Sequence, residues 1–502
     1  MEFNEQQRGR LDKAQKLRQL GIDPYPPRFE ERDHTIAQVL EHFDELKKDE
    51  HVEPAIVGQE VTIAGRIMLL RDKKVVFADL HEDNHKVQIY LKDSRLDAGA
   101  EGLQLFKETV DLGDIIGVRG KPFLTHTGEK TIEVSHWWML TKTINPMPDK
   151  YHGVTDTELR YRQRYVDLLV NPEVRDVFIK RSRIVSAMRR FLDSKGFLEV
   201  ETPVMQPLYG GASARPFTTR HNALDQTFYL RIADELYLNR LLVGGLNRVY
   251  EISKDFRNEG IDITHNPEFT MMECYQAFAD YHDIMALNEQ MIAYIAQEVL
   301  GTTKITTHGH EVELQPPWRR MTMRDALIEY GGLDYEAFPE QSALYAELRS
   351  RNVEVAPDTV WPKLVDEAYK NLVRPKLIQP TFLYDYPQRL SPLAKRKPGH
   401  PNTAERFQTI IAGIESSNAF SELNDPMDQA ARFAEQTKNR AAGDDEAMQT
   451  DDDFINALMY GMPPTGGIGI GIDRLAMLLL DQYSIRDVIL FPQMRTIEPG
   501  QS

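Results

Sequence analysis

Residues 248–275 read RVYEISKDFRNEGIDITHNPEFTMMECY, and their pattern decides how the rest of the chain is interpreted. Alternate residues before the turn, and again after it, share one face of an extended segment, which predicts a hairpin of two strands. The turn covers residues 258–265 with Gly260 at its tip, and Pro267 opens the second strand, where a missing amide is tolerated. This hairpin presents six polar or aromatic side chains: Arg257, Glu259, His265, Phe269, Glu273 and Tyr275.

Taken singly, each of these side chains is best explained as part of a surface hairpin with a salt-bridged rim. Together they supply a planar guanidinium for a phosphate or carboxylate, a ring that stacks on a base, and a glutamate that holds an ammonium group. FRNEG followed by HNPEFTMME resembles the second signature motif of class II aminoacyl-tRNA synthetases. Its form is most similar to that of lysyl-tRNA synthetases.

Length and composition limit the possible classes of protein. A chain of 502 residues suggests two to four domains, and a hydrophobic share of 41% is enough for real cores. The single cysteine, Cys274, excludes an internal disulfide and a cysteine zinc cluster. Because no apolar run approaches membrane-spanning length and the first residues resemble no signal peptide, we expect a soluble, cytoplasmic protein without a membrane partner. A net charge of −17 argues against indiscriminate coating of nucleic acid, but allows RNA held by a local basic face.

Residues 61–140 contain five short strand patterns, VTIAGRIM, VVFADL, HKVQIYL, DIIGVRGKPF and KTIEVSHWWML. With the longest gap, residues 92–113, between the third and fourth strands, they predict a small barrel of the oligonucleotide-binding (OB) type. Arg66, Phe77 and Gln88 would project from it as a cation, a stacking ring and an amide, the mixture that reads RNA loops. Singly, each is more simply a packing or surface residue, but the resemblance implies that they bind the tRNA anticodon.

The predicted fold class is α+β, with an antiparallel-sheet class II synthetase catalytic domain behind an N-terminal five-stranded OB-type β-barrel. We expect an N-terminal helix and linker in residues 1–55, the barrel in 56–145, and a linker in 146–175 around Pro146, Pro148 and Gly153. The catalytic domain would cover 176–502, with an insertion at about 301–385. An apolar helical stripe in residues 177–192, followed by FLEVETP, resembles the first class II motif, which implies a homodimer.

Residues 461–480 read GMPPTGGIGIGIDRLAMLLL, whose glycines suggest a dinucleotide loop at first sight. A dinucleotide loop needs its glycines between the first strand and the helix of a parallel βαβ unit, whereas this segment lies near the chain end. We therefore predict a glycine-rich strand that leads into a helix near Asp473 and Arg474, which resembles the third class II motif.

The resemblance also implies roles for single residues. Arg257 and Arg474 would be catalytic, contacting the α-phosphate and lysine carboxylate and the γ-phosphate respectively. Phe269 would stack on adenine, and ATP would also contact Glu259, His265 and Asn266. The lysine-binding residues would be Gly211 and Glu235 at the α-ammonium, and Glu273, Tyr275, Asn418, Phe420 and Glu422 along the side chain and ε-ammonium.

A magnesium site is implied as well, with one departure. The family pattern has glutamates seven residues apart, whereas this chain has RFQ at the first position, leaving Gln408 and Glu415. A neutral amide still offers an oxygen but removes a charge, so one metal would bind more weakly or through Glu422. His308 and His310 and the acidic run at 443–453 are explained as surface features.

These observations predict ATP-dependent activation of L-lysine and its transfer to the 3′ end of lysine tRNA. The chemistry requires in-line positioning and neutralisation of phosphate charge rather than acid or base catalysis. One alternative is a paralogue that transfers lysine or an analogue to a protein or lipid. The complete barrel disfavours this alternative. Another is a catalytically silent RNA-binding relative, for which Gln408 is the only support.

Overall fold

The structure is a computed structural model that describes residues 2–46, 60–125, 127–148, 156–441 and 448–496. Parts of the predicted N-terminal linker, the boundary residue Gly153 and the start of the acidic run lie outside these described residues. The chain divides into two compact units, Met1–Thr155 and Asp156–Ser502, which are described separately below.

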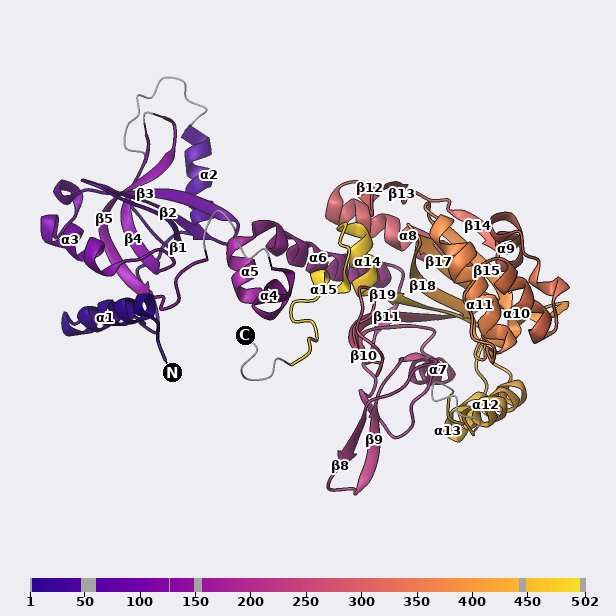
Figure 1. Ribbon diagram of the computed structural model, residues 1–502. Coiled ribbons are helices and arrows are strands. Elements are labelled where there is room, and N and C mark those ends of the chain that lie inside the picture. Colours follow the sequence, from indigo (N-terminus) through magenta and orange to yellow (C-terminus); the bar gives the residue numbers. More distant parts are fainter. Residues whose placement is uncertain (1, 47–59, 126, 149–155, 442–447, 497–502) are drawn as a thin grey trace. The chain divides into compact units, whose positions relative to one another are not determined.

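The first unit is built on a closed five-stranded barrel, in the order β1-β2-β3-β5-β4 (Figure 1). Its strands are β1 (Val61–Asp72), β2 (Val76–Glu82), β3 (His85–Leu91), β4 (Ile115–Leu124) and β5 (Lys130–Thr141). Alternate strand residues point inward and form an apolar core that includes Ile63, Leu80 and Ile89. The helices are α1 (Glu5–Gln19), α2 (Ile36–Leu46) and α3 (Gly99–Thr109), and α3 follows the third strand. The predicted OB-type barrel is therefore confirmed.

The second unit contains a nine-stranded sheet in the order β14-β15-β17-β18-β19-β11-β10-β6, with β16 (Arg396–Lys397) paired to β17. All neighbours are antiparallel except β6 with β10 and β14 with β15. The strands are β6 (Leu198–Glu199), β10 (Arg248–Phe256), β11 (Glu268–Ala277), β14 (Arg319–Thr322), β15 (Thr381–Pro387), β17 (His400–Ile411), β18 (Ile414–Ser421) and β19 (Thr465–Gly471). The hairpin β10–β11 and the glycine strand β19 form as predicted, and β19, yellow in Figure 1, lies between β18 and β11.

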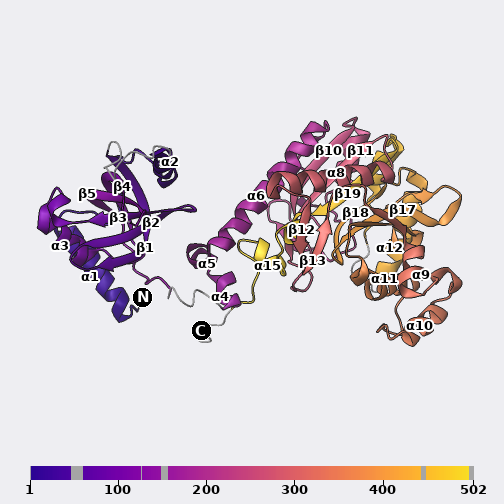
Figure 2. The ribbon, with the colours of Figure 1, turned by 90° about the horizontal axis from the view of Figure 1, so that it is seen from above.

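The helices of the second unit pack in three hydrophobic clusters, and members of each are labelled in Figure 2. The main core joins α6 (Pro172–Ser194), α8 (Tyr281–Leu300) and α14 (Ile472–Leu479) to one face, where Met272 and Ile468 are buried. A second cluster contains α7 (Glu235–Val243), α12 (Pro426–Ala441) and α13 (Asp452–Met459). The third contains α9 (Met323–Gly331), α10 (Gln341–Ser350) and α11 (Trp361–Leu372) beside β15. This confirms an α+β fold.

The stretch predicted as an insertion, about 301–385, is continuous with the sheet, because β14 and β15 are two of its strands. The stretch predicted as a linker, 146–175, contains α4 (Thr157–Arg162) and α5 (Arg164–Val170), which belong to the second unit. Arg164 explains this docking, since its buried guanidinium pairs with Asp167 and donates to the main-chain carbonyls of Arg486 and Leu490.

Smaller elements complete the second unit. They are a sheet of β7 (Met205–Gln206), β8 (Thr218–His221) and β9 (Gln226–Leu230), the hairpin of β12 (Lys304–Thr307) and β13 (His310–Glu313), and α15 (Ile485–Val488). None of the helices in the described ranges is both long and apolar enough to cross a membrane.

Candidate functional site

A cavity of about 380 Å³ opens on the sheet of the second unit. Met272 and Ile468 face the main core, whereas their neighbours Glu273 and Gly467 line the cavity, so it lies on the face away from that core. Every residue predicted to bind ATP or lysine lines it: Gly211, Glu235, Arg257, Glu259, His265, Asn266, Phe269, Glu273, Tyr275, Asn418, Phe420, Glu422 and Arg474. The structure thus brings together residues that are spread over more than half of the chain.

Two glycines allow the cavity to form. A Cβ atom on Gly467, in β19, would overlap Glu422 Oε1 and the ring of Tyr275, so this strand provides a floor without side chains. Gly211 has a φ of +86°, and a Cβ there would lie 3.0 Å from Ala233 Cβ and 3.2 Å from Glu235 Cβ. Both positions therefore require glycine for a close approach rather than for nucleotide binding by a loop.

One end of the cavity is rich in arginine and histidine. The Arg257 guanidinium lies 5.0 Å from the centre of the Phe269 ring and donates to the Ile232 carbonyl. Arg474 Nη2 donates to His265 Nε2 at 3.2 Å, and His265 Nδ1 lies 2.8 Å from Asp262 Oδ2. His265 thus links Arg474 to Asp262 in a chain of polar contacts. Two cations and a ring therefore converge where the resemblance implies a nucleotide.

The other end is lined by buried carboxylates. Tyr275 donates its hydroxyl proton to Glu273 Oε2 at 2.9 Å, and the main-chain N–H of Asp234 donates to Glu273 Oε1 at 3.3 Å. Asn239 donates to Glu422 Oε2 at 3.1 Å. Within the described part of the chain, Glu422 Oε1 has no hydrogen-bond partner although the residue is only 2% exposed. A buried, unsatisfied carboxylate oxygen at the cavity wall is suited to a cationic ligand.

Burial changes the acidity of this end. It raises the pKa of Glu273 to about 8, reinforced by the charges of Asp255 and Glu235. Burial and the neighbouring Glu422 charge raise the pKa of Glu235 well above its usual value, and burial likewise raises that of Glu422. Positively charged ligands therefore relieve a real electrostatic cost in this pocket.

Two of the three predicted magnesium ligands, Glu415 and Glu422, line the cavity. Gln408 does not line it, and Gln408 Oε1 accepts a hydrogen bond from Tyr386 at 2.8 Å. The magnesium assignment of all three residues stays a prediction.

Sequence reasoning missed Arg406, which lines the pocket, and Asn239, which lies behind it. Asn239, which orients Glu422, lies four positions after Glu235 on α7 and hence on the same helix face; that spacing was the available signal. Arg406 lines the cavity, donates to Asn418 Oδ1 at 2.8 Å and lies 4.7 Å from the centre of the Tyr386 ring. Nothing in the local pattern of β17 distinguishes Arg406 from a surface arginine.

In the barrel unit, Phe77 and Gln88 lie on the outer faces of β2 and β3. The Phe77 ring is 5.0 Å from that of Tyr90, and Gln88 Oε1 accepts a hydrogen bond from Thr131 Oγ1 at 3.1 Å.

Arg66 lies on β1, opposite His81 in the register with β2, and therefore at the other end of β2 from Phe77. Its guanidinium donates to the Gly113 carbonyl. One nitrogen of the Arg66 guanidinium is thus held by the main chain, and its contact with the anticodon stays a prediction.

Comparisons with known proteins agree with this arrangement. Residues 156–495 match the family described as tRNA synthetases class II (D, K and N), and residues 61–140 match the OB-fold nucleic acid binding domain. Proteins named lysine–tRNA ligase are similar to the chain: 54% identical from Roseiflexus sp. (strain RS-1), with 99% of each chain covered, and 52% identical from Bacillus subtilis (strain 168), with 98% of each covered. One from Moorella thermoacetica is 52% identical, with 97% of each covered. With matches of this extent to both units, the chain belongs to the class II tRNA synthetases of the D, K and N group.

Proposed function

We propose that the chain is a lysine–tRNA ligase, which activates L-lysine with ATP and transfers it to the 3′ end of lysine tRNA. The observation that carries this proposal is the acidic end of the cavity, where Glu422 Oε1 is buried and unpaired beside Tyr275 and Glu273. The full-length similarity to proteins named lysine–tRNA ligase supports it. Aspartate or asparagine would place an acidic or neutral side chain against these carboxylates and would not satisfy them.

In the first step, the lysine carboxylate attacks the α-phosphorus of ATP, and pyrophosphate leaves. Arg257 neutralises charge on the α-phosphate and carboxylate, while Phe269 supports the adenine. Arg474, held by His265, faces the γ-phosphate end. The reaction needs no general base because the carboxylate is already ionised, so positioning and charge neutralisation carry the step.

Glu415 is the residue that would hold Mg²⁺. It is the single member of the predicted set that supplies a carboxylate at the phosphate end, and Mg²⁺ is commonly held by one or two carboxylates together with substrate phosphates. When bound, the ion neutralises phosphate charge. We assign Gln408 no contact with the ion, because the Gln408 amide oxygen accepts a hydrogen bond from the Tyr386 hydroxyl.

Lysine selectivity follows from desolvation. An ammonium that leaves water needs acceptors in a preformed pocket, and an analogue without that group leaves buried carboxylates unpaired. Such a site rejects the analogue by on the order of ten-thousand-fold without an editing reaction. Glu235 and Gly211 would hold the α-ammonium, with Glu422 and Tyr275 at the ε-ammonium.

For the second step, Phe77 and Gln88 would contact the anticodon, with stacking on Phe77 supplying affinity. We also propose a homodimer, because α6 and the FLEVETP segment after it resemble the first class II motif and Leu198 in that segment is 52% exposed. Light scattering coupled to size exclusion checks this, and a monomer at micromolar concentration would contradict it.

Lysine-dependent exchange of labelled pyrophosphate into ATP, measured across the amino acids, tests the function. Exchange with lysine alone is the expected result; none with the folded protein would exclude activation and favour a silent RNA-binding relative. Charging of purified lysine tRNA then separates a tRNA ligase from a paralogue with another acceptor, for which exchange would occur without charging.

A further inference from the structure

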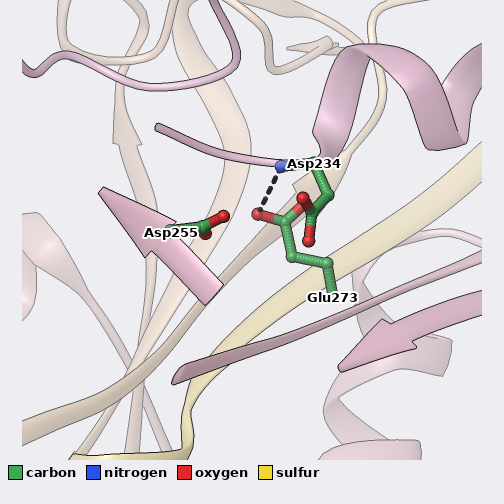
Figure 3. A group of neighbouring side chains, drawn as sticks. All are labelled: Asp234, Asp255 and Glu273. Carbon is green, nitrogen blue, oxygen red and sulfur yellow. Dashed lines mark hydrogen bonds between the residues drawn. The ribbon is translucent and has the colours of Figure 1, made fainter. Parts of the chain in front are cut away.

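Behind the acidic end of the cavity lies a group of three buried carboxylates, Asp234, Asp255 and Glu273 (Figure 3). They come from the residue before α7, from β10 and from β11, and one oxygen of each lies within 4.8 Å of the others. Asp234 and Asp255 are fully buried, and neither lines the cavity. Glu273 is therefore the single member of the group that reaches the substrate pocket.

The positive charge around this group is smaller than the negative charge. Arg231 Nη1 lies 3.1 Å from Asp234 Oδ1, its Nε lies 3.5 Å from Asp255 Oδ1, and Nη1 also donates to Glu251 Oε1 at 2.6 Å. The second cation is Arg257, which is electrostatically coupled to Asp255. Among the described residues, two arginines thus face four buried carboxylates: Asp234, Glu251, Asp255 and Glu273.

Two of these carboxylates also have oxygens that lack hydrogen-bond donors. Within the described ranges, neither carboxylate oxygen of Asp234 receives a hydrogen bond, and Asp255 Oδ2 receives none. Arg231 approaches Asp234 at ion-pair distance without hydrogen-bond geometry. Buried carboxylates without donors are costly when ionised. A proton on one of them supplies the missing donor and removes one of the excess charges.

A bound metal ion is the other way to compensate three carboxylates. Here an ion placed among them would lie close to the Arg231 guanidinium, which contacts Asp234 at 3.1 Å. Repulsion between two cations a few ångströms apart, in a region of low dielectric constant, opposes that arrangement. A proton adds no such repulsion because it neutralises the carboxyl group that carries it.

We propose that the free protein holds a proton within the Asp234–Asp255–Glu273 cluster and releases it to solvent when lysine binds, an inference that rests on the proposed function. Glu273 provides the link, since its Oε1 faces the Asp234 main chain while its Oε2 accepts the Tyr275 hydroxyl at the cavity wall. A substrate ammonium beside this wall favours ionised Glu273, so the proton leaves the cluster for the buffer and no other bond changes.

The acidities of the cluster agree with this direction. Burial, with the charges of Asp255 and Glu273, raises the pKa of Asp234 to about 9, and burial raises that of Glu273 to about 8. Burial raises the pKa of Asp255 to about 6, opposed by Arg257 and Arg231. Glu235 and Glu422 also face the substrate and have raised pKa values, so they contribute protons of their own. The test must therefore separate the cluster from these two residues.

Calorimetry of lysine binding in buffers of different ionisation enthalpy measures the number of protons released. At neutral pH we expect the wild type to release protons when lysine binds. Asp234→Asn, which keeps the main-chain N–H and the side-chain volume, should release fewer protons, by up to one. Asp225→Asn is the matched control, since Asp225 lies in the β8–β9 turn with its side chain 83% exposed. It should release as many protons as the wild type.

Equal proton counts in wild type and Asp234→Asn, with lysine bound by both, would overturn the inference and leave the proposed function standing. Absence of lysine binding by the wild type would overturn both. If Asp234→Asn binds no lysine, Asp255→Asn must show the lowered count, and an unchanged count there overturns the inference. A thermal midpoint that rises with Mg²⁺ or Ca²⁺ only when Asp234 is intact would assign the site to a metal ion instead.

Discussion

At the scale of single residues, the pocket requires the missing side chain of Gly467 as much as it requires the Glu422 carboxylate. Gly467 lies against Glu422 and Tyr275 in a space that a methyl group would fill. The unpaired oxygen of Glu422 lies in this same space, so the glycine gives the substrate access to it. Selectivity and close packing are therefore consequences of the same arrangement of side chains.

Gly467→Ala should weaken lysine binding and leave ATP binding nearly unchanged. Overpacking of this kind costs about 1–3 kcal/mol, which corresponds to a rise of about five- to 140-fold in the KM for lysine. The KM values for lysine and ATP in pyrophosphate exchange measure this. Gly9→Ala is the control, because nothing lies within 4 Å of its added methyl group. A parallel loss for both substrates would indicate a general disruption of the sheet.

Glu422→Gln should also affect lysine more than ATP. The change keeps the hydrogen bond with Asn239 possible but removes the charge that faces the ammonium. Loss of one partner of a buried charged pair costs about 2–5 kcal/mol, or roughly thirtyfold or more in lysine affinity. Binding titrations of the two ligands test this, and equal losses would contradict the role given to Glu422.

Some residue-scale roles stay predictions, because side-chain direction depends on partners that are remote in sequence. Gln408 and Arg66 lie on the strands where they were expected, yet Gln408 is held by Tyr386 and Arg66 by the Gly113 carbonyl. A motif places a residue on an element, but these contacts form only after strands pair. Asn239 was missed for the same reason, since its importance depends on Glu422 in another part of the chain.

At the scale of elements, the short segment before α7 connects both ends of the pocket. The Arg231 carbonyl accepts from the Phe256 amide, the Ile232 carbonyl accepts from Arg257, and the Asp234 amide donates to Glu273. One segment thus positions the arginine of the nucleotide end and a carboxylate of the lysine end. Its own position is maintained by the buried Arg231.

The acid cluster on this segment should make folding stability pH-dependent. Carboxyl groups titrate near 4 in the unfolded chain, whereas the pKa values of Glu273 and Asp234 are about 8 and about 9 in the folded state. A raised pKa means that the folded state binds more protons, so their contribution is present at low pH and is lost as pH rises through these values. The thermal midpoint of the wild type should therefore fall more steeply than that of Asp234→Asn between about pH 6 and pH 9. Parallel pH profiles would contradict the cluster's role in this dependence.

Elements with a local signal were predicted well. The hairpin, the barrel strands and the glycine strand all have period-two or glycine patterns that can be read within a few residues. The assignment of residues 301–385 to an insertion was less successful, because β14 and β15 join the sheet through pairing with each other and with the distant β17. Membership in a sheet is a non-local property that a short pattern does not contain.

At the scale of the whole molecule, the proposed function divides its tasks between the two units. All residues assigned to ATP and lysine lie in the second unit, whereas Phe77 and Gln88 lie in the first. Activation of lysine should thus be insensitive to changes on the barrel surface. Transfer to tRNA should require both units.

Phe77→Ala tests this division. Loss of a stacking ring costs about 1–3 kcal/mol per base, so the KM for tRNA should rise about five- to 140-fold while pyrophosphate exchange is unchanged. Circular dichroism checks that the barrel remains folded, since Phe77 also contacts Tyr90. A parallel fall in exchange by a folded variant would argue against the anticodon role.

The position of β19 affects the order in which the protein becomes functional during synthesis. This strand is made after every other strand of the sheet, yet it pairs with β18 and β11 in the interior of the sheet. On a translating ribosome, a nascent chain that ends before Thr465 has both of those edges open and lacks Gly467 as the pocket floor. Until the last strand has emerged, β18 and β11 therefore each lack a hydrogen-bonding neighbour, and unpaired strand edges favour association with other chains.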